Sequence, residues 1–151
     1  MVKRLTNPLQ NRDLPLGTLM SSAGARLAAR LDQGLADAGF ADLRAAHAAP
    51  FMVMDPGGSR PSQLAARAHM SKQAMGELVG YLVGRGYLET VADPSDGRAR
   101  LVRPTARGWR ALDAGVAVID AFDAWLDGQL GARGVDVLRK SLHLILEADI
   151  P

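Results

Sequence analysis

The sequence predicts a mainly α-helical protein that carries one small β-hairpin, and three observations lead to this fold class. Apolar residues recur at helical spacing over most of the 151 residues. Alanine is used heavily, which suits helices. One stretch differs, because two short apolar runs at 87–91 and 99–103 flank the turn-forming segment ADPSDG.

Charge is spread unevenly along the chain, although the formal net charge is only +2. Residues 60–108 hold eight Lys and Arg against four Asp and Glu, whereas residues 109–151 hold four against seven. Such a basic central third is typical of a chain that meets a polyanion with one part only. The absence of Cys excludes disulfides, thiolate metal sites and thiol redox sensing. No apolar stretch has the length of a signal peptide core or a membrane span, so we expect a cytoplasmic protein with no membrane partner.

The first expected element is a helix that begins at Leu16 and stops at Gly39, since its apolar residues step by three or four. A second helix is expected from Asp42 to about Met52. The segment DPGGSRP at 55–61 is then expected to be a loop.

Residues 61–86 predict two short helices with a break at 68–70. Pro61 suits a first helical turn, Ser71 suits an N-cap and Gly86 suits a helix stop. The residues expected in the buried stripe of the second short helix are Met75, Leu78, Val79 and Leu82. Those left to face outward are Ser71, Lys72, Gln73, Gly76, Glu77 and Gly80.

The hairpin follows the second short helix at once. We expect its tightest point at Gly97, with Asp96 and Arg98 on either side. Thr105 can then cap a long helix, and the segment GARG at 131–134 predicts a break before a last helix.

Two short helices joined by a tight break and followed by a hairpin make a winged helix-turn-helix. In that motif the second helix enters the DNA major groove and the hairpin reaches the backbone or the minor groove. Ser71, Lys72 and Gln73 open the second helix, where the helix dipole favours a phosphate and Lys and Gln can read base edges. Arginines at positions 98, 100, 103 and 107 lie where phosphates would be. These residues predict double-stranded DNA as a partner.

From the stretch SQLAARAHMSKQ onward, roughly residues 62–108, the sequence resembles the MarR (multiple antibiotic resistance regulator) family of bacterial transcription factors. The most specific motifs are GYLE, DPSDGR and a Thr and a Gly that open the next helix. The resemblance implies that Asp96 and Arg98 form the wing tip and that Arg98 enters the minor groove. The chain departs from the family pattern at Gly76 and Gly80, which are often polar, and at Gly97, which is often basic. The predicted DNA-binding residues are Ser62, Ser71, Lys72, Gln73, Gly76, Glu77, Asp96, Arg98 and Arg100.

The resemblance also implies one MarR-like domain over residues 1–151. Residues 16–54 and 105–149 would form a helical dimerisation region that flanks the winged helix-turn-helix lobe at 60–104. Many family members bind aromatic or phenolic ligands between these two parts, which makes Arg44, His47, Phe51 and Trp109 candidate ligand-binding residues. Trp109 is alternatively a core or dimer-interface residue. The predicted function is a ligand-responsive repressor that acts as a homodimer on a pseudo-palindromic operator.

The same residues allow other interpretations. Asp93 and Asp96 could be a metal pair, but turn-forming aspartates beside Pro and Gly explain them, and His47 and His69 lack partners at metal-ligand spacing. We therefore predict no metal and no cofactor. No catalytic motif is present, which predicts that the protein is not an enzyme. The main alternative is a winged-helix protein-interaction module without DNA binding, which the basic wing and the Lys/Gln helix start disfavour.

Overall fold

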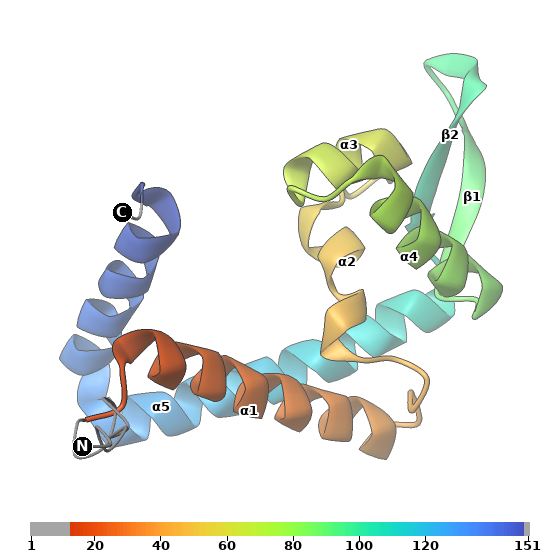
Figure 1. Cartoon of the computed structure of the whole chain (residues 1–151). Helices are drawn as coiled ribbons and strands as arrows, with labels where there is room; N and C mark the ends of the chain where they lie inside the picture. Colours follow the sequence, from red (N-terminus) through yellow and green to blue (C-terminus); the bar gives the residue numbers. More distant parts are fainter. Residues whose placement is uncertain (1–12, 150–151) are drawn as a thin grey trace, which may run out of the picture.

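A computed structural model describes residues 13–149 of the chain, and it confirms a mainly helical fold with one small hairpin. The elements in chain order are α1 (Leu16–Asp37), the 3-10 turn η1 (Ala45–His47), α2 (Ala49–Val53), α3 (Pro61–Arg67), α4 (Lys72–Gly84), β1 (Leu88–Asp93), β2 (Asp96–Pro104) and α5 (Ala106–Glu147). Figure 1 shows α1 lying along the first part of α5, while α2, α3, α4 and the hairpin form a lobe at one end of α5.

Helices α1 and α5 pack closely, but α1 is covered on one side only. A methyl group added at Gly34 would overlap the side chain of Val118 on α5, so the two backbones approach each other here. Leu35 is buried against α5, whereas Leu16 and Leu19 near the start of α1 are exposed. The apolar stripe of α1 is therefore only partly covered by this chain.

The prediction of a single helix from Asp42 to about Met52 is wrong. The chain forms the 3-10 turn η1 there and then the separate short helix α2. Pro50 lies in the first turn of α2, and inside a continuous helix it would remove a hydrogen bond and clash with the preceding turn. Asp32 of α1 also accepts a hydrogen bond from the Ala45 N–H at 2.6 Å, which ties the start of η1 to α1.

The core of the lobe lies between α3, α4 and the base of the hairpin. The Ser71 hydroxyl accepts a hydrogen bond from the Ala74 N–H at 3.0 Å and so caps α4 as predicted. On the inner face of α4 three of the four predicted residues are buried, while Leu78 is half-buried. The large fully buried side chains between α3, α4 and the hairpin include Leu64, Met75, Leu82, Tyr87, Leu88 and Val102. All six α4 residues predicted to face outward are exposed.

The hairpin turns two to three residues earlier than expected. Asp93 pairs with Asp96 across the strands, so the turn consists of Pro94 and Ser95, and Gly97 lies within β2 instead of at the tightest point. The cause is Asp93, whose Oδ1 accepts hydrogen bonds from the Ser95 N–H at 2.8 Å and the Ser95 hydroxyl at 2.6 Å. This carboxylate closes the turn over Pro94.

Helix α5 begins and bends where the sequence predicts. Thr105 Oγ1 accepts a hydrogen bond from the Gly108 N–H at 3.1 Å and donates one to the Gly86 carbonyl at 2.6 Å. The predicted break falls at Gly131, whose φ of 69° is a left-handed value that glycine adopts at little cost. After Gly131 the helix continues in a new direction (Figure 1). Within residues 13–149, no helix combines the length and apolar character needed to cross a membrane.

Candidate nucleic-acid interface

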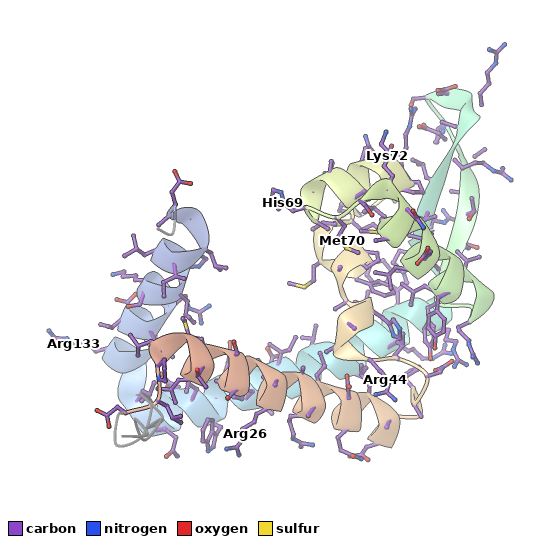
Figure 2. All side chains as sticks on the ribbon, in the orientation of Figure 1. Arg26, Arg44, His69, Met70, Lys72 and Arg133 are labelled. Atoms are coloured by element: carbon purple, nitrogen blue, oxygen red, sulfur yellow. The ribbon has the colours of Figure 1, made fainter. Side chains whose placement is uncertain are left out.

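The start of α4 is an exposed, positively charged helix end. Ser71, Lys72 and Gln73 are all exposed, and the Lys72 ammonium has no ion-pair partner among residues 13–149. Figure 2 shows Lys72 on the side of the lobe toward which the hairpin also extends. A free cation beside the amides of a helix N-terminus gives a surface that favours an anion.

The outward face of α4 carries one polar pair, Gln73 and Glu77, with Gly76 and Gly80 before and after Glu77. Gln73 Nε2 donates a hydrogen bond to Glu77 Oε1 at 3.2 Å, which holds the carboxamide along the helix. Gly76 and Gly80 have open space where a side chain would begin, with no atom within 4 Å. The side chains able to reach a partner are therefore concentrated in the first turn of α4. Ser62 is also exposed, in the first turn of α3.

The four arginines after the hairpin turn have two kinds of surroundings. Arg98 and Arg100 are exposed on β2 and form no ion pair within the described part of the chain. Arg103 is paired with Glu89, with 2.7 Å between Nε and Oε1. The sequence pattern made no distinction among them, but the free positive charge of the hairpin is confined to its outer half.

Arg107 belongs to a polar cluster at the foot of the lobe. Its Nη2 donates a hydrogen bond to the Tyr87 hydroxyl at 2.9 Å and lies 3.5 Å from Asp42 Oδ1, while its guanidinium covers the Tyr87 ring at 4.6 Å from the ring centre. The Tyr87 hydroxyl in turn donates to Asp42 Oδ1. This hydrogen bond lowers the pKa of Asp42, and burial raises the pKa of Tyr87. Arg107 thus joins α5 to the lobe and is not a free surface cation.

The hairpin turn is held by carboxylates and one distant arginine. Asp93 Oδ2 accepts hydrogen bonds from Arg60 Nε at 2.8 Å and Nη2 at 2.6 Å. Asp96 Oδ1 accepts one from the Arg98 N–H at 3.2 Å, and its Oδ2 lies 3.5 Å from Arg60 Nη2. Hydrogen bonds from Ser95 and then from Arg60 lower the pKa of Asp93 to about 2. Both aspartates therefore serve the turn and its contact with Arg60.

A separate cavity of about 260 Å³ lies between η1, α2, α1 and α5. Arg44, His47 and Phe51 line it, as do the apolar side chains of α1 and α5. Trp109 does not, because it borders another surface hollow beside Glu89 and Arg103. His47 Nδ1 accepts a hydrogen bond from the Arg44 N–H at 3.0 Å, and the His47 ring stacks on Tyr81 of α4 at 4.6 Å. The cavity is thus mostly apolar with a polar edge; Figure 2 shows Arg44 near the junction of α1 and the lobe.

Comparisons with known proteins agree with this geometry. A family model described as MarR family matches residues 51–99, which span the lobe from α2 to the hairpin. A probable transcriptional regulator from Pseudomonas aeruginosa has a similar structure, with a TM-score of 0.68, 26% sequence identity, and coverage of 87% of this chain and 96% of that chain. Residues 51–99 of this chain therefore match the MarR family, and the chain shares the fold of a probable transcriptional regulator.

Two further solved structures share the fold of this chain at lower identity. CouR from Rhodococcus jostii RHA1 bound to p-coumaroyl-CoA is 24% identical, with a TM-score of 0.70 over 90% of this chain and 94% of that chain. The S. aureus MepR-DNA complex is 15% identical, with a TM-score of 0.74 over 89% of this chain and 98% of that chain. A comparison with curated protein sequences gave no match.

The site residues that the sequence pattern did not indicate are those whose partners lie far along the chain. Arg60 and Asp93 are 33 positions apart, and nothing in the local pattern around either residue indicates the other. The leucines that line the cavity, such as Leu31 and Leu43, were visible only as core-type residues. A cavity depends on which apolar faces fail to meet, and this is decided by packing.

Proposed function

We propose that this protein is a sequence-specific DNA-binding regulator of transcription of the MarR family, with no enzymatic activity. The observation that carries the proposal is that Lys72 at the start of α4 and Arg98 and Arg100 of the wing are exposed and form no ion pair within residues 13–149, and that the wing extends on the side of the lobe where Lys72 lies (Figure 2). A Lys or Gln at a helix start suits the edges of bases in the major groove, and a wing arginine suits a narrow minor groove. A structural relative, MepR, was solved as a complex with DNA.

Each residue of this surface has a role in the proposal. Lys72 contacts a phosphate or a guanine edge, and Gln73, released from Glu77, reads an adenine edge. Ser62 and Ser71 contact the DNA backbone, and Gly76 lets α4 approach the groove closely. Asp96 supports the tip from which Arg98 enters the minor groove, while Arg100 faces the backbone.

The protein acts as a homodimer in this proposal. Leu16 and Leu19 of α1 and Leu142 and Ile145 of α5 expose a third or more of their surface, and they lie on the two terminal helices. Apolar stripes of this kind are usually covered by a partner, and a second copy of the chain would cover the stripes of α1 and α5 together. A two-fold dimer requires a pseudo-palindromic operator with half-sites roughly one helical turn, about 34–36 Å, apart.

Regulation by a small aromatic ligand is part of the same proposal. The apolar cavity lies between the lobe and the two long helices, and its edge carries Arg44 and His47. A ligand with an aromatic body and an acidic group fits this lining, and the related CouR was solved with p-coumaroyl-CoA. Binding there would change the distance between the α4 helices of the two copies, so that they no longer fit the two half-sites. The dimer, which we place in the cytoplasm, would then release the promoter that it blocks. Repression is therefore the proposed direction of control.

Selection of bound fragments from genomic DNA with the purified protein tests the proposal. We expect enrichment of a palindromic sequence at moderate salt. Gln73→Ala should reduce discrimination between this sequence and random DNA by roughly 1–3 kcal/mol per base pair read, whereas Lys72→Ala should weaken binding to both. Recovery of no enriched sequence by the wild-type protein would favour the protein-interaction module.

A further inference from the structure

We propose that Arg60 is a positioning residue that fixes the tip of the wing relative to α4. The proposal concerns how the wing is held, and it rests on the proposed function only for the consequence in DNA binding. Arg60 is the residue immediately before α3, so it belongs to the helix-turn-helix and not to the hairpin. Its effect would pass through Asp93 and Asp96 to the arginines that follow them.

One guanidinium reaches both strands at the turn. Asp93 is the last residue of β1 and Asp96 is the first residue of β2. Arg60 donates two hydrogen bonds to Asp93 Oδ2, at 2.8 and 2.6 Å, and its Nη2 lies 3.5 Å from Asp96 Oδ2. The Asp93 side chain is 7% exposed and that of Arg60 is 36% exposed, so this pair is better shielded from water than the exposed pair of Arg103 and Glu89.

The backbone of Arg60 is held by hydrogen bonds on both sides of the residue. The Arg60 N–H donates a hydrogen bond to Gln63 Oε1 at 3.0 Å. The preceding residue, Ser59, exchanges two backbone hydrogen bonds of 3.0 Å with Val102 of β2 and is buried. The Arg60 backbone therefore has little freedom, and its side chain transmits that rigidity to the turn.

The tip needs such support because a two-stranded hairpin is marginally stable by itself. The base of this hairpin is held by the buried Leu88 and Val102, but residues 94–98 are exposed. Apart from the backbone ladder between β1 and β2, the hydrogen bonds and ion pairs of Arg60 are those that connect residues 93–98 to the rest of the lobe within residues 13–149. Without them Arg98 would project from a mobile turn.

The Asp93→Asn substitution distinguishes the support of the turn from the effect of charge, because the two predict opposite changes in DNA affinity. Asp93→Asn removes a negative charge from a hairpin that faces a polyanion, so electrostatics alone predicts tighter DNA binding. Asparagine keeps an oxygen that can accept the Ser95 hydrogen bonds, but it loses the ion pair with Arg60. A loss of affinity in this variant is therefore opposite to the charge effect and reports the loss of support.

The experiment compares wild type, Arg60→Gln, Asp93→Asn and the double variant. The matched control is Glu89→Gln, which breaks the exposed pair of Glu89 with Arg103 at the base of the same hairpin. Two quantities are measured: amide hydrogen exchange of residues 93–98 in the free protein, and affinity for a mixed-sequence duplex and for the selected genomic fragment. Both single variants should exchange faster at the tip and bind the fragment about fivefold to tenfold more weakly, and the double variant should be no worse than the singles. Glu89→Gln should exchange like wild type and bind at least as tightly.

The proposal is overturned if Asp93→Asn keeps wild-type exchange at the tip and binds DNA as tightly as wild type or more tightly. It is also overturned if Arg60→Gln alone weakens binding and flattens the salt dependence, because Arg60 would then be a phosphate contact. Failure of the wild-type protein to bind any DNA would refute the proposed function, and hydrogen exchange at residues 93–98 would still decide whether Arg60 holds the tip.

Discussion

At the scale of single residues, the arginines of the hairpin differ in what they can offer a partner. Arg103 and Arg107 already have acidic or aromatic partners within the chain, whereas Arg98 and Arg100 have none in the described residues. A cation that is already paired gains less from a phosphate, because the existing pair must first be broken. The free cations of the outer hairpin are therefore the ones we expect to contact DNA.

Replacing Arg98 tests this expectation. Arg98→Ala should leave the melting temperature nearly unchanged, because the side chain is exposed. It should weaken binding to the selected fragment and reduce the salt dependence by about one unit of slope for each wing. Arg103→Ala is the matched control and should change the slope less. Unchanged affinity and slope for Arg98→Ala would mean that the wing does not touch DNA.

The Asp93 carboxyl makes stability depend on pH. Its pKa in the fold is about 2, below the ordinary value of 3.8, so its contribution to stability is complete above the ordinary value and is lost as pH falls through the lower one. Asp93→Asn should melt below wild type at neutral pH, and the difference should shrink as pH falls from 3.8 to about 2. Melting curves in a pH series measure this. A difference that stayed constant over that range would contradict the assignment.

At the scale of elements, the start of α5 is the point where the long helix meets the lobe. Thr105 caps α5 and also bonds to the Gly86 carbonyl, and the Thr105 N–H donates to the Tyr87 carbonyl at 3.0 Å. Gly108 is buried directly against Tyr87. The first turn of α5 can approach the backbone of Tyr87, between α4 and β1, this closely only because position 108 has no side chain.

Adding one methyl group at this junction should therefore be costly. The new carbon of Gly108→Ala would overlap the backbone oxygen of Tyr87, which cannot rotate away, and we expect a loss of about 1–3 kcal/mol or more in unfolding free energy. Gly76→Ala is the control in an open position of α4, and it should gain up to about 1 kcal/mol. Denaturant unfolding measures both. Equal effects of the two substitutions would show that the close approach at Gly108 is not tight.

At the scale of the whole molecule, α5 connects the lobe, which has its own core, to a C-terminal segment in which few side chains are buried. The buried residues concentrate in the lobe and at its junction with α1 and α5. Beyond Gly131, α5 exposes a series of large apolar side chains and packs on little of the described chain (Figure 1). An exposed apolar surface of this size is expected to be covered by a partner in water.

Charging the exposed C-terminal stripe tests the proposed dimer. Leu142 is 41% exposed, and Leu142→Glu should give a monomer or an aggregate, because a carboxylate cannot be buried unpaired in an apolar interface. Sedimentation measures the assembly state. Glu147→Gln near the end of α5 is a control that should sediment like wild type. A Leu142→Glu protein that remained a stable dimer would place the interface elsewhere.

Local chemistry in the sequence was enough to predict much of the fold. The cap at Ser71, the outward face of α4, the start of α5 at Thr105 and the break at Gly131 each depend on residues within a few positions of one another. Short-range hydrogen bonds and backbone preferences act in the same way in any context, so these features could be read directly. The exposure of the proposed DNA-reading residues follows from the same periodicity.

Only the tertiary structure decided the features that depend on distant partners. Pro50 splits the expected second helix and Asp93 sets the hairpin turn through Ser95, which are local effects that the sequence prediction missed. The partners that hold these two features, Asp32 for η1 and Arg60 for the hairpin turn, come from distant parts of the chain. The packing of the chain also decides three further features. Arg98 has no ion-pair partner among residues 13–149, Arg107 binds the Tyr87 hydroxyl, and Trp109 does not line the cavity. A side chain's partner is whichever group the folded chain brings within a few ångströms, and the sequence states only which groups are available.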